Sequence, residues 1–520
     1  MNLASLTEIF RQVKPYEALR HRLQSGSDVA PLALSSSTRP AIVAALARDL
    51  ARPLLLLTAR SDHARLWVEQ LQVWMPDEQQ VYHLADPDAL PYERIAWSRE
   101  TRQARLRALI ALSKTPEAPT VIVASARALT QKTLPPRELR MNLRTLRPGQ
   151  TLNLTKALSQ WLGVGYVNEA MVDEPGTFSR RGGIVDIWPP NQAHPARLEL
   201  FGNEIESIRL FNPATQRTEG QIDTLLVGPA NESLCKFGPS SAERLGVLDI
   251  RVCQPIVQED FERELALLAE GIPFRGMEFF LPYLYSQPAS ALDFLPIEGL
   301  LVIDEAADLA TTTVDLEGQA NQLQRDLRQS GELPEGTLRP FWTWDELQPL
   351  LAARRPLLLG YSDLMGHTMP QRSDLARAFK SGPRYGGQMR RILQEIEEER
   401  AKGERLVLVS RQASRLADLL QEAGHPVSQE TRLSEIPQPR SLTVMQGILP
   451  EGWLLYPEAQ IDEEEEGSNG RHGDMCTLCT LLTDAELFGW TKPQPQRMPR
   501  PRPVAPETFF ADMQPGDFVV

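Results

Sequence analysis

The sequence predicts two α/β domains, the first of them interrupted by a small α+β insert. Three observations support this fold class. Strand-like and helix-like segments alternate through residues 1–130, which is typical of a mainly parallel sheet covered by helices. Two extended runs meet at a Gly-Asn turn near residue 202, which indicates a hairpin. A second alternation of helix and strand begins near residue 385.

The elements of the first domain follow from hydrophobic spacing. Apolar runs give strands, and apolar side chains at helical spacing give helices. The strands are expected at 31–37, 53–59, 121–126, 300–309 and 356–362, and the helices at 40–51 and 61–74. The extended segments of the insert are 176–190 and 196–211, and the Gly202-Asn203 turn within the second segment joins two extended runs into a hairpin.

The second domain alternates in the same way. Helices are expected at 388–403 and 411–424, and strands at 405–410, 441–447 and 452–458. Gly403 and Gly424 follow the last helical turns, where glycine is the usual C-terminal residue. The acidic run 462–474 predicts a solvated loop, because like charges resist packing. The proline-rich run 492–507 predicts a stiff linker.

The composition indicates a cytoplasmic protein. The 520 residues include 42 prolines and four cysteines, too few cysteines for a disulfide framework in a chain of this length. The first residues lack the apolar core of a signal peptide, and the sequence offers no apolar run long enough for a membrane span. The net charge of −13 favours a protein partner over an extended phosphate-binding surface, although it leaves room for a local basic patch.

A parallel sheet of this kind invites a search for a nucleotide site. A phosphate-binding loop needs glycines, a lysine for the terminal phosphates and a hydroxyl for magnesium. The corresponding stretch after the first expected strand contains neither glycine nor lysine. It reads Ser35, Ser36, Ser37, Thr38 and Arg39. We therefore predict a degenerate nucleotide loop, no catalytic residues and no nucleotide or magnesium cofactor.

Two acids end a strand where magnesium ligands would lie in a complete nucleotide site. They are Asp304 and Glu305. Without a lysine loop we interpret them as a relic, or as acids favoured by the dipole at a helix start. We likewise interpret Arg39 as part of a plain strand-to-helix turn. His472, Cys476 and Cys479 provide only three of the four ligands of a structural zinc site, so we predict no metal.

The stretch 174–218 closely resembles the insert domain shared by UvrB and the transcription-repair coupling factors. It has an aromatic residue, an Arg-Gly pair, an Arg-x-Glu strand and a Phe-Gly-Asn-Glu-Ile turn in the order of that family. Residues 90–112 resemble the coupling factors and lack the tyrosine-rich insertion of UvrB. Residues 406–420 with 481–490 resemble domain 3 of the coupling factors, and 507–520 resemble the opening of their RNA polymerase-interacting domain.

This resemblance implies a domain plan built on a UvrB-like, degenerate P-loop-type sheet. The expected parts are UvrB-like domain 1a at 1–138, the UvrA-interacting insert at 139–228, UvrB-like domain 1b at 229–365, a linker at 366–384, domain 3 at 385–491, a proline-rich linker at 492–506 and a truncated polymerase-interacting start at 507–520.

The resemblance also implies that the insert binds UvrA. The family motif carries over to Phe178, Arg180, Arg181, Arg197 and Glu199. Arginine and aromatic side chains are the usual anchors of protein interfaces. The alternative is that these arginines are ordinary surface residues paired with neighbouring glutamates. Gly182 and Gly183 are interpreted as structural, permitting a bulge or a close approach of two backbones.

The expected function is therefore a UvrA-binding module that recruits nucleotide excision repair to a stalled RNA polymerase and is not itself an enzyme. In the family, RNA polymerase and DNA are engaged by domains outside this chain. Masking by the motor would be absent here, so the surface is expected to be open. The alternatives are a UvrB-like, ATP-dependent DNA-binding protein, a decoy that titrates UvrA, and a truncated product without function.

Overall fold

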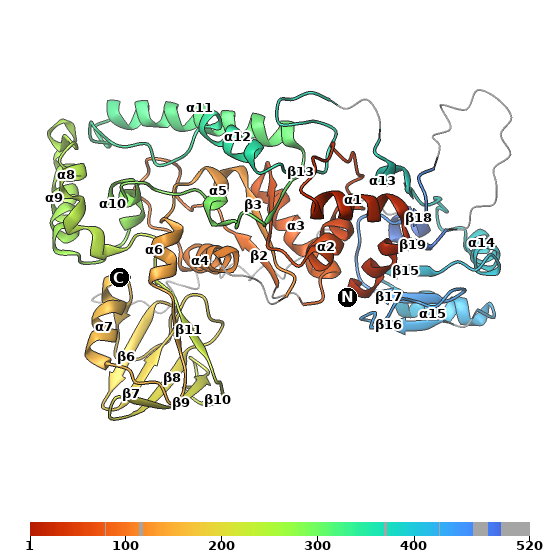
Figure 1. Ribbon diagram of the computed structural model, residues 1–520, viewed down its shortest axis with the longest axis horizontal. Helices are drawn as coiled ribbons and strands as arrows, with labels where there is room; N and C mark the ends of the chain where they lie inside the picture. Colours follow the sequence, from red (N-terminus) through yellow and green to blue (C-terminus); the bar gives the residue numbers. More distant parts are fainter. Residues whose placement is uncertain (78–79, 114–117, 369–371, 426, 461–476, 490–520) are drawn as a thin grey trace, which may run out of the picture. The chain divides into compact units, whose positions relative to one another are not determined.

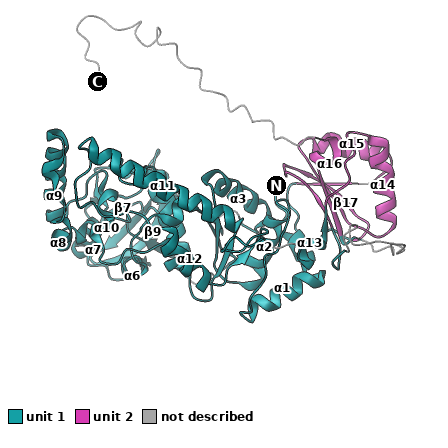
Figure 2. Ribbon diagram, turned by 90° about the horizontal axis from the view of Figure 1, so that it is seen from above, with its two compact units in different colours: residues 1–380, 431–438, 455–478 teal, residues 381–430, 439–454, 479–520 magenta. Residues whose placement is uncertain are grey.

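The computed structural model describes residues 1–77, 80–113, 118–368, 372–425, 427–460 and 477–489. The chain divides into two compact units, shown in teal and magenta in Figure 2. The first unit contains residues 1–380, 431–438 and 455–478, and the second contains 381–430, 439–454 and 479–520. The predicted acidic loop at 462–474, the linker at 492–506 and the segment 507–520 lie outside the described residues. Among the described residues, no helix is long and apolar enough to span a bilayer.

The body of the first unit is a five-stranded parallel sheet, as predicted. Its order is β13-β12-β1-β3-β2. These strands are β1 (Leu54–Thr58), β2 (Val81–Leu84), β3 (Val121–Ser125), β12 (Leu300–Ile303) and β13 (Leu357–Leu358). Every residue of β1 and β3 is buried, which explains their uninterrupted apolar runs: a parallel strand is covered on both faces.

The rest of the first unit outside the insert consists mainly of helices and short 3-10 turns (η), of which α2, α3 and α4 lie beside the sheet (Figure 1). Before β12 they are η1 (Ala4–Gln12), α1 (Lys14–Gln24), α2 (Arg39–Leu50), α3 (Ser61–Trp74), α4 (Arg99–Ser113), α5 (Ala126–Thr130), α6 (Pro136–Met141), η3 (Cys235–Phe237), η4 (Pro239–Ser241), α8 (Ala242–Leu245), η5 (Ile250–Val252), α9 (Pro255–Glu270), η6 (Met277–Phe280), α10 (Leu281–Leu284) and η7 (Ala291–Phe294). After β12 they are α11 (Ala306–Gln329), α12 (Trp344–Ala353) and α13 (Asp374–Arg377), followed by the short strand β14 (Phe379–Lys380).

The expected strand at 31–37 was wrong. Residues 31–35 have no regular structure, although Leu32, Ala33 and Leu34 donate backbone hydrogen bonds to carbonyls of residues 358–360. Ala33 has a φ of 52°, a left-handed conformation that interrupts an extended ladder. The segment therefore lies along β13 without becoming a strand of the sheet.

The insert is a separate sheet with the order β10-β9-β8-β7-β6-β5, accompanied by α7 (Leu154–Gly163). Its strands are β5 (Val167–Asn168), β6 (Thr177–Arg181), β7 (Ile184–Ile187), β8 (Ala196–Phe201), β9 (Glu204–Phe211) and β10 (Thr218–Gln221). A two-stranded ribbon of β4 (Arg144–Leu146) and β11 (Leu225–Val227) joins it to the body. The hairpin at Gly202-Asn203 is confirmed. The run 176–190, expected as one strand, is itself a hairpin, because Gly182 takes a φ of 64° and turns the chain.

The second unit is also α/β. Its sheet runs β18-β19-β15-β17-β16, and β15 pairs in parallel with both β17 and β19. The elements are α14 (Met389–Ala401), β15 (Leu406–Ser410), α15 (Ala413–Glu422), β16 (Ser428–Glu430), β17 (Leu442–Gln446), β18 (Trp453–Leu455), β19 (Cys479–Thr483) and α16 (Asp484–Phe488). Gly403 and Gly424 follow α14 and α15 with φ values of 98° and 87°, as the C-terminal glycines predict.

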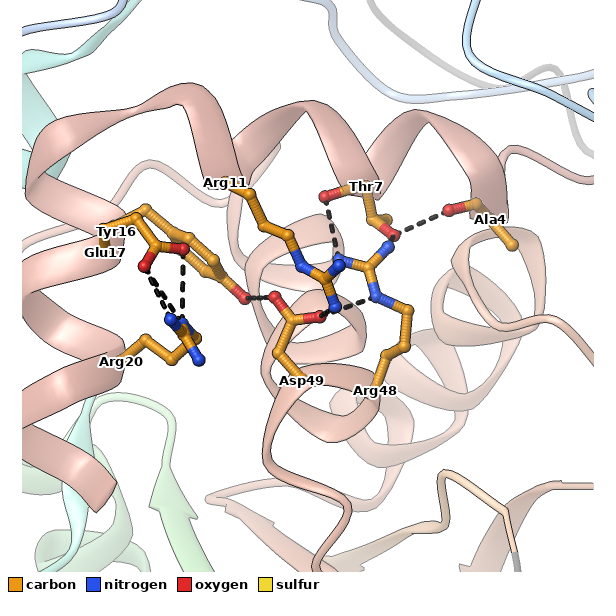
Figure 3. Close-up of polar contacts among 8 residues, drawn as sticks. All are labelled: Ala4, Thr7, Arg11, Tyr16, Glu17, Arg20, Arg48 and Asp49. Atoms are coloured by element: carbon orange, nitrogen blue, oxygen red, sulfur yellow. Dashed lines mark hydrogen bonds and ion pairs between the residues drawn. The ribbon is translucent and has the colours of Figure 1, made fainter. Parts of the chain in front are cut away.

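The end of α2 is fixed to the N-terminal helices by a buried carboxylate (Figure 3). Asp49 accepts hydrogen bonds from Arg48 Nε at 2.7 Å, from Arg11 Nη2 at 2.8 Å and from the Tyr16 hydroxyl at 2.9 Å. Arg48 also reaches Thr7 Oγ1 on η1 at 2.6 Å. Burial alone would raise the pKa of Asp49, but the hydrogen bonds from Arg48 and Arg11 outweigh it and hold the pKa below its usual range.

Asp49→Asn is expected to lower the free energy of unfolding by roughly 2 kcal/mol at neutral pH, because charged hydrogen-bond acceptors are lost. A depressed native pKa stabilises the fold above the unfolded pKa of about 3.9 and ceases to do so as pH falls through the native value. The difference in free energy of unfolding between parent and variant should therefore become smaller below about pH 4. Urea unfolding from neutral to acid pH checks this. Asp28→Asn, at a carboxylate 83% exposed, is the control; a pH-independent difference for Asp49→Asn would contradict the account.

Candidate functional site

The tips of two neighbouring hairpins meet at one edge of the insert. The β6–β7 turn is Gly182-Gly183, and the β8–β9 turn is Gly202-Asn203. The Leu200 amide donates to the Gly183 carbonyl at 2.8 Å. A Cβ atom added to Gly183 would lie 2.9 Å from the Leu200 carbonyl oxygen, closer than side chains are found. The structural role expected for these glycines is thus a φ-positive turn at Gly182 and a close backbone approach at Gly183.

Strand register decides which side chains share a face of this sheet. Directly paired residues of antiparallel strands point to the same side. One row across β6, β7, β8 and β9 is Ser179, Asp186, Arg197 and Arg209, and the next is Arg181, Ile184, Glu199 and Ser207. The opposite face carries the buried side chains of the insert, among them Phe178, Val185, Ile187, Leu198 and Ile208. Arg181, Arg197 and Glu199 therefore lie together on the outer face.

Phe178 is not a surface residue. Its side chain is only 2% exposed and makes an edge contact with Trp161 of α7, with ring centroids 5.7 Å apart. A partner could not reach Phe178 without disrupting this packing. The expectation that Phe178 contacts a partner is therefore corrected: the motif aromatic anchors the edge of β6 to α7 and positions the arginines that follow it.

Arg197 is held in place by a carboxylate on the neighbouring strand. Its Nε and Nη2 atoms bond the two Asp186 oxygens at 2.7 and 2.9 Å, and its guanidinium lies 4.8 Å from the centre of the Phe211 ring. The hydrogen bond to Asp186 raises the pKa of Arg197. Arg197 is thus paired with a neighbouring carboxylate, as the alternative expects, but that carboxylate belongs to Asp186 rather than to a glutamate.

Glu199 has different neighbours. It accepts a hydrogen bond from the Ser207 hydroxyl at 2.7 Å, and it forms an ion pair with Arg209, whose Nη2 lies 3.2 Å away. Arg197 and Glu199 are both half-buried, and both have their rotamers fixed by these contacts. The Arg-x-Glu pair is thus a preformed polar surface, and its two members do not neutralise each other.

Arg180 and Arg181 are exposed and, in the part of the chain that the structure describes, have no carboxylate partner. Arg181 donates to the Ala170 carbonyl at 2.8 Å, and Arg180 makes a long contact of 3.4 Å to the Gly182 carbonyl. By register, Arg181 belongs to the outer face and Arg180 to the opposite one. Arg181 is therefore the arginine that adds an uncompensated positive charge to the outer face.

One exposed aromatic residue was missed by the sequence reasoning. Phe201, at the end of β8, is 84% exposed, and Ile184 at the adjacent tip is 39% exposed. The signal was present in the sequence, because strand alternation places Phe201 on the same face as Arg197 and Glu199. We use the name hairpin surface for the set Arg181, Ile184, Arg197, Glu199 and Phe201.

The degenerate loop forms a self-contained turn before α2. The Ser35 hydroxyl lies 3.3 Å from that of Ser37 and 3.2 Å from that of Thr38, which also donates to the Ser35 carbonyl. Ser36 is exposed. The hydroxyls at the position of a phosphate-binding loop are thus bonded mainly to each other and to their own turn.

Arg39 fills the space between the loop and the acids that end β12. Its Nη1 bonds Asp304 at 2.6 Å, its Nη2 bonds Glu305 at 2.5 Å, and its Nε donates to the Leu34 carbonyl. Burial would lower the pKa of Arg39, but the charges of Asp304 and Glu305 outweigh it and raise the pKa. The two acids that could hold a cation are therefore already bound to a permanent one.

The zinc-like spacing lies largely outside the described residues, which exclude His472 and Cys476. Cys479 is fully buried in β19, and burial raises its pKa to about 12, far from the thiolate that binds metal. Within the described ranges, no three His, Cys, Asp or Glu side chains are grouped to bind a metal ion.

Comparison with known proteins supports the resemblance seen in the sequence. Residues 145–232 match the family model described as the UvrB interaction domain. The chain is 25% identical to the transcription-repair-coupling factor of Bacillus subtilis over 97% of its own length and 41% of the relative. It is 29% identical to that of Myxococcus xanthus and 31% identical to that of Mycobacterium bovis, covering 24% and 26% of those proteins. The chain thus spans at most about two fifths of these three relatives, and its resemblance to their N-terminal portion is confirmed.

Proposed function

We propose that the hairpin surface binds UvrA, and that the chain serves as the UvrA-binding module of transcription-repair coupling. The observation that carries this proposal is the coincidence of two findings. The match to the UvrB interaction domain covers residues 145–232. The same residues present a preformed outer face with an exposed aromatic and an arginine that forms no ion pair with any described residue.

The chemistry of this face suits a protein interface. Arginine and aromatic residues dominate the binding energy of such interfaces. Arg181 can form a two-point contact with a carboxylate, and Phe201 and Ile184 provide apolar area beside it. The side chains of Arg197 and Glu199 are already ordered by Asp186, Ser207 and Arg209, so less conformational entropy is lost on binding.

Arg181→Ala together with Phe201→Ala is expected to weaken UvrA binding at least about 100-fold, since an anchor residue contributes about 2 kcal/mol or more. Biolayer interferometry with immobilised UvrA measures this. Both side chains are exposed, so the fold should be preserved, which circular dichroism verifies. Arg217→Ala is the matched control, because Arg217 is an exposed arginine of the insert outside the hairpin surface. Equal affinities of parent and double variant for UvrA would show that the hairpin surface is not the UvrA-binding site.

The proposal includes the absence of ATP hydrolysis and of a bound nucleotide. Its support is the position of Arg39 between Asp304 and Glu305, where a magnesium ion would otherwise lie. An ATPase assay with and without DNA tests it: turnover above background would favour the UvrB-like alternative. From the relatives we also propose that the chain recruits repair to a stalled polymerase and does not act as a decoy that titrates UvrA. Repair rates in cells that overproduce the chain distinguish the two, because a decoy would lower them.

A further inference from the structure

Four arginines lie within eleven residues where the chain enters the insert. They are Arg137 and Arg140 of α6, Arg144 of β4, and Arg147 just beyond it, and we name this set the basic strip. All four are exposed. The segment contains one acid, Glu138, although the whole chain carries a net charge of −13. The strip is therefore a positively charged segment in a protein whose net charge is negative.

The arginines of the basic strip have no ion pair within the described part of the chain. Three of the four arginines of α4 differ: Arg99 pairs with Glu174, Arg105 pairs with Glu232, and Arg107 donates to the carbonyls of Pro190 and Gln192. These three arginines thus support the fold, whereas the four arginines of the strip are exposed and form no ion pair among the described residues.

The one acid of the segment is itself partly compensated. Lys236 Nζ lies 3.9 Å from Glu138 and donates to the Asn142 side chain at 3.0 Å. Downstream of Arg147, the amide of Gly149 donates to the Ile205 carbonyl at 2.7 Å. The strip therefore runs from α6 along the β4–β11 ribbon to the edge of β9, on a part of the first unit that these hydrogen bonds hold in place.

We propose that the basic strip contacts the phosphate backbone of duplex DNA. Apolar and aromatic anchors, which characterise the centre of protein interfaces, are scarce here: Met141 is the large apolar side chain exposed between residues 136 and 148. Single-strand binding uses aromatic side chains for base stacking, and this segment contains none. Unpaired arginines without such anchors suit sequence-independent phosphate contacts. This contact is independent of the hairpin surface, and it adds DNA to the partners of the chain itself.

The test is fluorescence anisotropy of a short labelled DNA duplex titrated with the whole chain at several salt concentrations. Binding should weaken with salt, with a logarithmic slope of about −3 to −4 if most of the strip is engaged. Arg140→Glu with Arg144→Glu should reduce affinity at low salt about 10-fold or more and make the slope shallower by about 2. The matched control is Arg65→Glu with Arg415→Glu, which changes the net charge equally at two exposed arginines elsewhere.

Three outcomes would overturn the proposal. The parent chain could fail to bind duplex even at low salt. The strip variant and the control could lose the same affinity, which would show that binding depends on the net charge of the chain and not on the position of the strip. The strip variant could retain duplex binding while losing UvrA, which would assign the strip to an acidic protein surface. Because the hairpin surface is intact in both variants, a failure here is distinguishable from a failure of UvrA docking.

Discussion

Arg105→Ala is expected to lower the free energy of unfolding by about 4–5 kcal/mol, the upper part of the range for breaking a buried ion pair. Arg105 of α4 bonds Glu232 through Nε at 2.5 Å and Nη2 at 3.1 Å, and both side chains are 1% exposed. Its Nη1 also donates to the Ala85 carbonyl. Removing the guanidinium leaves Glu232 as a buried charge with the Thr133 hydroxyl as its remaining side-chain donor.

The ion pair between Arg105 and Glu232 lies where the insert joins the body of the first unit, so breaking it weakens that junction. Glu232 follows β11, where the chain leaves the insert and returns to the body, and its carbonyl accepts from the Tyr285 hydroxyl at 2.7 Å. Urea unfolding followed by circular dichroism measures the effect, with Arg65→Ala as an exposed control. Replacing both partners, as in Arg105→Met with Glu232→Leu, should recover much of the stability, because no unpaired charge remains. An Arg105→Ala variant as stable as the control would contradict the account.

Arg39→Ala is expected to lower the free energy of unfolding by about 3 kcal/mol, at the lower end of the range for breaking a buried ion pair. Asp304 keeps hydrogen bonds from Trp67 Nε1 at 2.8 Å and from the Thr58 hydroxyl at 3.4 Å, so it is not left wholly unpaired. The Glu305 side chain is 36% exposed, and solvent compensates part of its charge.

The same variant separates a structural arginine from a nucleotide-binding one. Arg39→Lys should recover only part of the stability, because a lysine cannot reproduce the fork that reaches Asp304, Glu305 and the Leu34 carbonyl together. Thermal unfolding of both variants, with and without ATP and magnesium, checks this. Arg60→Ala, which removes an exposed pair with Asp62, serves as the control. Stabilisation of the parent chain by ATP would show that nucleotide binds despite the contacts of Arg39 with Asp304 and Glu305, and would contradict the account.

Much of the fold could be predicted because its signals are local. The leucines of residues 54–57 form a run that suits a strand buried on both faces, and β1 lies at the centre of the sheet. The Gly202-Asn203 turn and the alternation of β8 and β9 likewise depend on neighbours in sequence. The strand expected at 31–37 failed because of one residue, Ala33, whose positive φ no propensity indicates.

The contacts that define the candidate site are long-range, and this limited their prediction. Arg39 and Asp304 are 265 residues apart, so their pairing depends on β1 and β12 becoming neighbours. Phe178 resembles an interface aromatic in sequence, but the position of α7 buries it against Trp161. The alternation of side chains along β8 could have predicted the face on which Phe201 lies. Its 84% exposure could not be predicted, because it depends on where the β8–β9 turn ends.

The most direct test of UvrA docking is hydrogen–deuterium exchange of the chain with and without purified UvrA. The amides at the two hairpin tips, residues 182–184 and 201–203, lie in or beside turns and should exchange quickly in the free chain. The account predicts that UvrA slows exchange at both tips and leaves α14 and α15 of the second unit unchanged. Unaltered exchange at the tips under saturating UvrA, or protection confined to another part of the chain, would contradict it.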